Sequence, residues 1–202
     1  MSKVIATITM SVDGYVTGPD DGPGCGLGVG GERLHYWVMG GPWTYDNEHE
    51  PGTDMEAADK AFFASLTGSL GAGICGRGMY ESAGAWGGTN PFDGPLFVLT
   101  HRIADQPDPS AGFTFVDGFD AALAAAREAA GDKDVAISGG ADTIRQALRA
   151  GVVDTLAVST APVVLGAGKR LFDGFTDDLE LAITAVHHST YAVHTVYDVL
   201  EP

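Results

Sequence analysis

The sequence predicts an α/β fold with a mixed, mostly parallel central sheet, helices on both faces of the sheet and an antiparallel C-terminal edge. Between about residues 54 and 160, short apolar runs typical of buried strands alternate with segments of helical periodicity. Such alternation favours parallel strands joined by crossover helices. After residue 160 strand-like runs follow one another, and a short link at 188–190 joins the last two, which indicates an antiparallel hairpin.

The N-terminal quarter combines one strand signal with a long irregular segment. Residues 3–18 form an apolar, β-branched run that enters a turn at Asp13-Gly14. Residues 19–53 are rich in glycine and proline apart from an apolar patch at 34–39, and predict a loop with one or two helical turns. We expect one domain over residues 1–202 that carries this segment as an insertion. Loops of this length are usually functional or mobile.

The other elements follow from periodicity and composition. Residues 54–69 place Phe62, Phe63 and Leu66 on one helical side, and residues 119–131 form an alanine-rich helix that ends at glycine. A third helix is predicted over 141–154, and a helix begins after the Gly-Arg-Gly sequence at 76–78. The predicted strands cover residues 72–76, 95–100, 113–116, 134–140, 155–166, 179–189 and 191–200.

Charge and composition exclude several classes of protein. The 27 acidic and 11 basic residues give a formal charge of −16, which opposes binding of nucleic acid and of anionic membranes. An anionic cofactor would therefore need local donors. Neither of the two cysteines, Cys25 and Cys75, has CxxC spacing, and the six histidines show no ligand spacing, so we expect no metal site. With no signal-peptide pattern and no run of membrane-spanning length, we expect a cytoplasmic protein.

Three predicted strands end in residues that can bind an anion. They are followed by Gly76-Arg77-Gly78, by Thr100-His101-Arg102 and by the Gly139–Thr143 segment that opens a helix. Ligands of open α/β sheets bind beyond the carboxyl ends of strands, and a glycine turn before a helix can offer backbone N–H groups to phosphate. These ends could line one side of a phosphorylated nucleotide. A plain tight turn and a solvated arginine remain the alternatives.

Two glycine-rich stretches are weaker signals. Residues 26–31, GLGVGG, match G-x-G-x-x-G, but no strand precedes them, so they do not predict a dinucleotide-binding turn. The stretch at 163–172 places Gly166, Gly168 and Lys169 after a strand, where they form a glycine turn or meet a substrate phosphate.

Five segments, in the same order, resemble a known family across nearly the whole chain. They are TMSVDGYVTGPDD, GRGMYES, LFVLTHR, ISGGADTIRQAL and APVVLGAGKRLFDG. With them the chain resembles the dihydrofolate reductase-like superfamily, and most closely the C-terminal reductase domain of bacterial bifunctional riboflavin deaminase-reductases.

The resemblance implies that NADPH is the cofactor and hydride donor. It implies that Arg77 and Thr100, with His101 and Arg102, face the adenosine 2′-phosphate or the pyrophosphate. The residues implied to hold the pyrophosphate are Gly139, Gly140, Ala141, Asp142 and Thr143. Thr9 and Val16 would border the nicotinamide.

The chain departs from the bifunctional enzymes in two ways. It has no H-x-E with P-C-x-x-C, which a zinc deaminase requires, so we do not expect the two-step activity. The 19–53 insertion carries four aromatic residues that indicate a lid or substrate wall, with a surface flap or dimer contact as the alternative: Tyr36, Trp37, Trp43 and Tyr45.

Two carboxylates are candidates for the catalytic acid. In folate reductases a carboxylate on the helix before the Gly-Arg motif holds the pterin, and Asp59 lies close to the corresponding place. A solvated ion pair with the adjacent Lys60 is the alternative for Asp59. Asp13 is the second candidate, although Asp-Gly is also favourable turn chemistry.

These features favour an NADPH-dependent reductase of a small heterocyclic or sugar-linked substrate. The alternative is a non-catalytic nucleotide- or small-molecule-binding protein on the same fold, and a purely structural dimer module is the third hypothesis. We expect a homodimer in each case, because an apolar C-terminal strand edge invites pairing.

Overall fold

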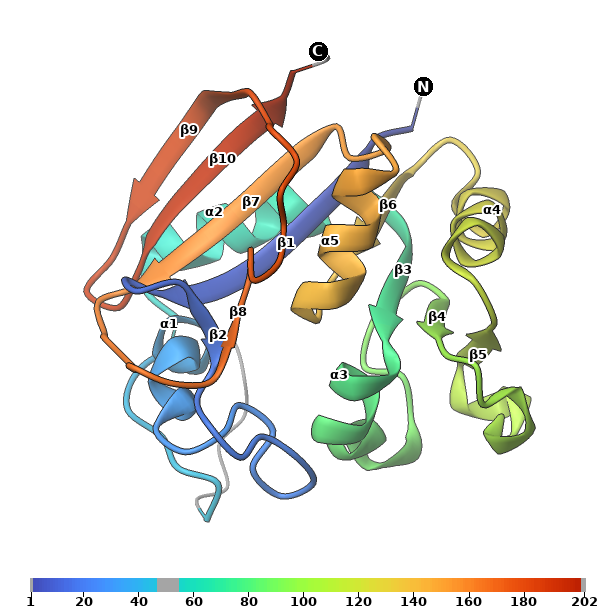
Figure 1. Cartoon of the computed structure of the whole chain (residues 1–202), viewed down its shortest axis with the longest axis horizontal. Coiled ribbons are helices and arrows are strands. Elements are labelled where there is room, and N and C mark those ends of the chain that lie inside the picture. The colour runs from blue at the N-terminus through green and yellow to red at the C-terminus, as the bar shows by residue number, and fades with distance from the viewer. Residues whose placement is uncertain (1, 47–54, 201–202) are drawn as a thin grey trace.

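Eight strands form one central sheet in the computed structural model, which describes residues 2–46 and 55–200 (Figure 1). The strand order is β5-β4-β3-β6-β1-β7-β10-β9. The strands are β1 (Val4–Ser11), β3 (Leu70–Gly76), β4 (Leu96–Leu99), β5 (Phe113–Val116), β6 (Asp134–Ile137), β7 (Thr155–Ala161), β9 (Leu181–His188) and β10 (Val193–Val199).

The direction of the strands confirms the predicted mixed sheet. The six strands from β5 to β7 are parallel, and β1, the fifth of them, pairs with β6 on one side and β7 on the other. Strand β10 runs antiparallel to both β7 and β9, so the C-terminal hairpin closes one edge. The carboxyl ends of β3, β4 and β6 therefore lie side by side at the same end of the parallel strands.

Helices cover both faces of the sheet, as predicted. Helices α4 (Phe119–Ala130) and α5 (Ala141–Arg149) bury alanine, leucine and isoleucine side chains against one face. Helices α1 (Tyr36–Met39) and α2 (Ala57–Thr67) pack on the other face, together with Ala157 of β7. The neighbours of Ala157 in β7, Leu156 and Val158, belong to the first core, as the period-two alternation of a strand requires.

Up to residue 46, the segment between β2 (Tyr15–Thr17) and α2 contains the short helical turns that its apolar patch predicts. It contains a 3₁₀ helix, η1 (Gly31–His35), followed directly by α1. Leu34 is completely buried, and Trp37 and Met39 are nearly so. The helical part of this segment therefore contributes side chains to the core. No strand precedes GLGVGG, which excludes a dinucleotide-binding turn there.

Two local features differ from the expectations. A two-residue strand, β8 (Lys169–Arg170), pairs antiparallel with β2 in a small second sheet that the sequence does not predict. Helix α5 ends at Arg149 rather than at 154, because the chain turns at Gly151, whose φ of +63° suits glycine. Helix α3 (Arg77–Ser82) begins at Arg77, directly after β3.

Strand β9 of the C-terminal hairpin exposes apolar side chains on its outer face. His187 packs against Phe62 of α2, so Val186 points to the opposite face of β9. Ile183 shares that face through its pairing with Tyr197 and is 65% exposed. The homodimer stays a prediction, for which this face is the candidate. No helix within residues 2–46 and 55–200 is both long and apolar enough to cross a membrane.

Candidate active site

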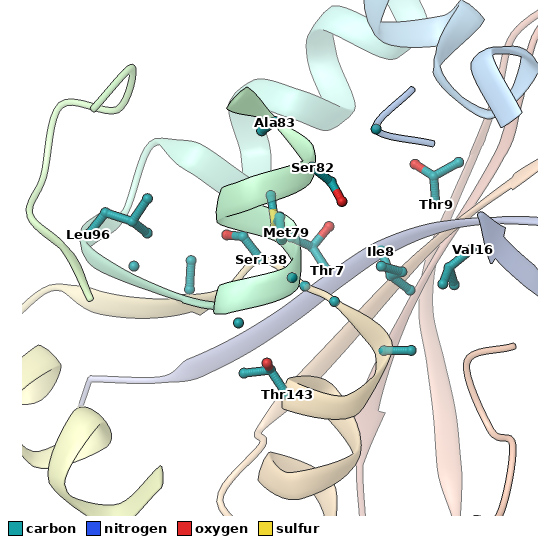
Figure 2. Close-up of a pocket in the computed structure, with 18 of the residues that line it drawn as sticks. Thr7, Ile8, Thr9, Val16, Met79, Ser82, Ala83, Leu96, Ser138 and Thr143 are labelled. Atoms are coloured by element: carbon teal, nitrogen blue, oxygen red, sulfur yellow. The ribbon is translucent and has the colours of Figure 1, made fainter. Parts of the chain in front are cut away.

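A cavity of about 1860 Å³ opens at the carboxyl ends of β3, β4 and β6 and extends past β1 to the segment before α2 (Figure 2). Small-molecule pockets usually measure about 300–1,000 Å³, so this cavity has room for a dinucleotide and a second small molecule. All of the residues predicted to bind a cofactor line it: Thr9, Val16, Arg77, Thr100, His101, Arg102, Gly139, Gly140, Ala141, Asp142 and Thr143.

The glycine turn between β6 and α5 forms the middle of the cavity. The amide of Gly76 donates to the carbonyl of Gly139 at 2.9 Å, which joins the ends of β3 and β6. A Cβ atom at Gly76 would lie 2.6 Å from Oγ1 of Thr143, so only glycine lets the first turn of α5 approach β3 this closely. Gly139 has a φ of +110°, a region that L side chains rarely adopt. The local sequence thus explains the shape of the turn.

Ionisable side chains gather at the β3 and β4 ends, and each basic side chain there lies beside an acid. Arg77 binds Glu81 and Asp105, Arg102 binds Glu81, and His101 contacts Asp117. Thr100 is buried, and its hydroxyl accepts from the amide of Arg102. The i,i+4 spacing of Arg77 and Glu81 could have predicted one of these pairs. No sequence signal indicates Asp105.

Aromatic side chains from the segment before α2 form the other end of the cavity. Trp37, Trp43 and Tyr45 line it, whereas Tyr36 packs on Tyr191 instead. The indole Nε1 of Trp37 donates to Oγ1 of Thr9 at 3.1 Å, which ties this wall to β1. The described residues therefore form a cavity wall, one of the two roles considered for the insertion.

His35 is a cavity residue that the sequence did not indicate. It lies at the end of η1, two positions before Trp37. Burial lowers the pKa of its imidazole from 6.5 to about 4. At neutral pH the cavity therefore holds an uncharged imidazole at this end.

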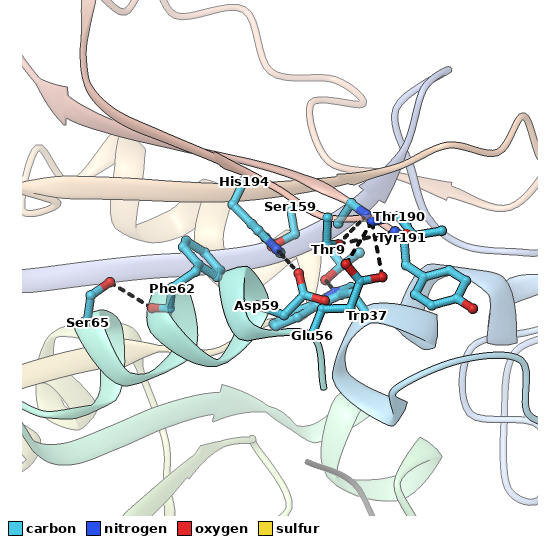
Figure 3. Close-up of polar contacts among 12 residues, drawn as sticks. Thr9, Trp37, Glu56, Asp59, Phe62, Ser65, Ser159, Thr190, Tyr191 and His194 are labelled. Carbon is cyan, nitrogen blue, oxygen red and sulfur yellow. Dashed lines mark hydrogen bonds and ion pairs between the residues drawn. The ribbon is translucent and has the colours of Figure 1, made fainter. Parts of the chain in front are cut away.

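Asp59 lies outside the cavity, in a buried hydrogen-bonded chain (Figure 3). Its Oδ1 lies 2.7 Å from Nε2 of His194, and Nδ1 of His194 lies 2.7 Å from Oγ of Ser159. The three residues are buried, and Asp59 Oδ2 has no partner among the described residues. The alternative of a solvated ion pair with Lys60 is therefore wrong. A catalytic role for Asp59 stays a prediction that the cavity lining does not support.

The imidazole of His194 is enclosed by aromatic rings. It stacks on Phe62 with ring centroids 4.0 Å apart and meets Trp37 edge-on at 4.8 Å. Burial lowers the pKa of His194, and the hydrogen bond to Asp59 offsets part of this shift. The hydrogen-bonded chain of Asp59, His194 and Ser159 thus contacts the cavity wall through Trp37.

Asp13 also lies outside the cavity, in the turn between β1 and β2. Its carboxylate accepts from the hydroxyl of Ser11 and from the amides of Leu165 and Gly166. These hydrogen bonds, the one from Ser11 above all, lower the pKa of Asp13 to about 2. The position explains Asp13 as a clamp between two loops, and a catalytic role for it also stays a prediction.

Basic residues outnumber acidic ones in the cavity lining, although the chain as a whole is strongly acidic. Among the described residues, six of the 11 basic side chains line the cavity: Arg77, Arg102, Lys133, Arg145, Lys169 and Arg170. Only four acids within residues 2–46 and 55–200 line it, although the chain has 27. Lys169, from the predicted glycine turn at 163–172, is paired with Asp21. No group of three or more potential metal ligands occurs in the described residues.

Known structures share this fold over nearly the whole chain. A protein named for riboflavin biosynthesis, from Shewanella sp. PV-4, aligns with a TM-score of 0.70 and 19% identity over 98% of this chain and 99% of its own. A pyrimidine reductase-like protein from Corynebacterium diphtheriae gives 0.66 and 14% over 100% and 93%. Dihydrofolate reductase from Enterococcus faecalis, complexed with NADP(H) and RAB-propyl, gives 0.61 and 16% over 98% and 97%. The sheet is thus that of the dihydrofolate reductase-like fold.

Sequence comparison gives the family. A search of curated proteins finds no match, but the family model of the RibD C-terminal domain matches residues 2–197. This range includes the whole cavity lining and every strand of the sheet apart from the last two residues of β10. The chain therefore belongs to the RibD C-terminal domain family.

Proposed function

We propose that this protein is an NADPH-dependent reductase that acts on a carbonyl or imine of a small heterocyclic or sugar-linked substrate. The observation that carries the proposal is the extent of one cavity. It reaches from the ends of β3, β4 and β6, with the glycine turn after β6, to the aromatic wall. Membership of the RibD C-terminal domain family and the fold shared with reductases support it.

The described residues fit a phosphorylated dinucleotide. A Cβ atom at Gly78 or at Gly140 would meet nothing within 4 Å, so both backbones are open to a ligand in the cavity. The first backbone N–H groups of α5 have no acceptor within the helix, and they favour an anion. Nη1 of Arg77 is buried and has no partner in the described residues. These donors match the pyrophosphate and 2′-phosphate of NADPH.

Each part of the cavity has a role in this proposal. When bound, NADPH supplies the hydride. Gly139–Thr143 hold the pyrophosphate, and Arg77, Thr100, His101 and Arg102 hold the 2′-phosphate end. Thr9 and Val16 border the nicotinamide, while Trp37, Trp43 and Tyr45 exclude water from the substrate.

One observation favours a second candidate, a nucleotide-binding protein without catalysis. Neither Asp59 nor Asp13 lines the cavity. Neither carboxyl group is therefore placed to donate the proton that completes a reduction. This candidate predicts nucleotide binding without turnover, whereas the reductase predicts oxidation of NADPH with a suitable substrate.

Titration with NADPH and with NADH, followed by nicotinamide fluorescence, tests the proposal. Wild type, Arg77→Ala and Arg127→Ala are compared, because Arg127 is an exposed residue of α4 that does not line the cavity. A charged hydrogen bond to the 2′-phosphate contributes about 1.5–3 kcal/mol. We therefore expect wild type and Arg127→Ala to prefer NADPH about tenfold to a hundredfold, and Arg77→Ala to lose the preference.

The outcomes separate the candidates. If neither NADPH nor NADH binds at millimolar concentration, both candidate functions are rejected. Binding followed by NADPH oxidation, in a screen of small heterocyclic and sugar-linked carbonyls and imines, would support the reductase. Binding without oxidation of any of them would favour the second candidate.

A further inference from the structure

Two carboxylates already occupy the guanidinium group of Arg77. Nε donates to Glu81 Oε1 at 2.9 Å, and Nη2 donates to Asp105 Oδ2 at 3.0 Å. Only Nη1 lacks a partner within residues 2–46 and 55–200. The edge of the guanidinium that a phosphate would approach through two nitrogens is thus partly blocked by Asp105.

The guanidinium cannot easily turn away from these acids. Its central carbon lies 4.9 Å from the ring centre of Phe115 and 5.6 Å from that of Tyr80, so the group rests on aromatic side chains. Arg77 and Glu81 belong to α3, whereas Asp105 belongs to the 3₁₀ helix η3 (Ile103–Asp105), which follows β4. The ends of two adjacent strands hold the arginine and Asp105 together.

Glu81 and Asp105 are not equivalent. Glu81 accepts from both Arg77 and Arg102, and these two hydrogen bonds lower its pKa. Asp105 has one close contact, with Arg77, because Nε of Arg102 lies 3.8 Å away. A ligand phosphate would therefore displace Asp105 rather than Glu81.

We propose that Asp105 is a specificity-determining residue that competes with the 2′-phosphate of NADPH for Arg77. The inference rests on the proposed function, because it assigns the 2′-phosphate to this arginine. A phosphate monoester at Arg77 would lie beside the Asp105 carboxylate, and the two like charges would repel each other. Asp105 thus weakens the binding of NADPH and leaves that of NADH unchanged, so the wild-type preference is smaller than Arg77 alone would give.

Replacement of the charge by an isosteric amide tests this. Dissociation constants for NADPH and NADH are measured with wild type, Asp105→Asn and Glu128→Gln. Glu128 is an exposed residue of α4 outside the cavity lining, and its variant changes the net charge equally. We expect Asp105→Asn to bind NADPH about fivefold to tenfold more tightly, with NADH changed less than twofold. Glu128→Gln should leave both constants unchanged.

Competition by 2′-AMP and 5′-AMP gives a second readout without the nicotinamide. We expect Asp105→Asn to bind 2′-AMP more tightly than wild type does and to bind 5′-AMP equally well. Circular dichroism establishes that the variant is folded. If both nucleotides bind but Asp105→Asn leaves the NADPH constant unchanged or weakens it, Asp105 is an anchor of Arg77 and the inference is wrong. If neither nucleotide binds wild type, the proposed function fails and the inference fails with it.

Discussion

His194 Nε2 lies 2.7 Å from Asp59 Oδ1, and both side chains are completely inaccessible to solvent between α2 and the sheet. Removal of one member leaves the other as a buried polar group without its partner, which typically costs about 1–3 kcal/mol. We expect Asp59→Leu and His194→Phe each to lower the free energy of unfolding by this amount. Urea denaturation measures it. The double variant should recover part of the loss, and full additivity would contradict a coupled pair.

The imidazole of His35 should make stability depend on pH. Its pKa is about 4 in the folded protein and 6.5 in the unfolded chain, so between these values only the unfolded chain binds a proton. The free energy of unfolding should fall by up to about 3 kcal/mol as the pH decreases from 6.5 to 4. Thermal denaturation of His35→Gln across this range should show a smaller decrease. The same change at the exposed His188 is the control, and an unchanged slope in His35→Gln would refute the prediction.

A methyl group at Gly76 should disturb the glycine turn. Its carbon would lie 2.6 Å from Oγ1 of Thr143, and Thr143 has little freedom because it is buried in α5. We expect Gly76→Ala to lower the free energy of unfolding by about 1–3 kcal/mol, the usual cost of overpacking. Thr143→Ala in the same chain removes the clashing oxygen and should restore most of the loss. Equal stability of the single and double variants would exclude this clash as the cause.

The apolar face of the C-terminal hairpin should mediate a homodimer. Ile183 and Val186 are 65% and 57% exposed on this face, and a charge there would oppose burial against a second copy. We expect a dimer for wild type and a monomer for Ile183→Glu, by size-exclusion chromatography with light scattering. Ala129→Glu adds the same charge at an exposed site on α4. A monomeric wild type would show the prediction to be wrong.

The sheet and the cavity residues at the strand ends could be predicted because their signals are local. Buried strands such as residues 113–116 and helix starts such as Ala141 are encoded by composition and periodicity within a few residues. The family resemblance supplied the roles. All of the predicted cofactor residues line the cavity as a result.

The partners of the charged groups could not be predicted, because they depend on distant contacts. Asp59 and His194 are 135 positions apart, and Asp105 approaches Arg77 only where η3 follows β4. Strand β8 is too short for any periodicity and forms because β2 offers an edge. His35 enters the cavity through the placement of η1 on the sheet. All of these features depend on contacts between residues that are distant in the sequence, and local sequence patterns do not specify such contacts.

The central position of β1 has a consequence for how the chain folds. Val4 pairs with Val135 and Ile5 with Thr155, so both neighbours of this strand lie far along the chain. During synthesis β1 emerges early but must wait for β6 and β7 before its backbone groups are paired. Pairings of such large sequence separation fold slowly, and an unpaired strand edge is prone to aggregation. The nascent chain is therefore expected to depend on chaperones until β7 has left the ribosome.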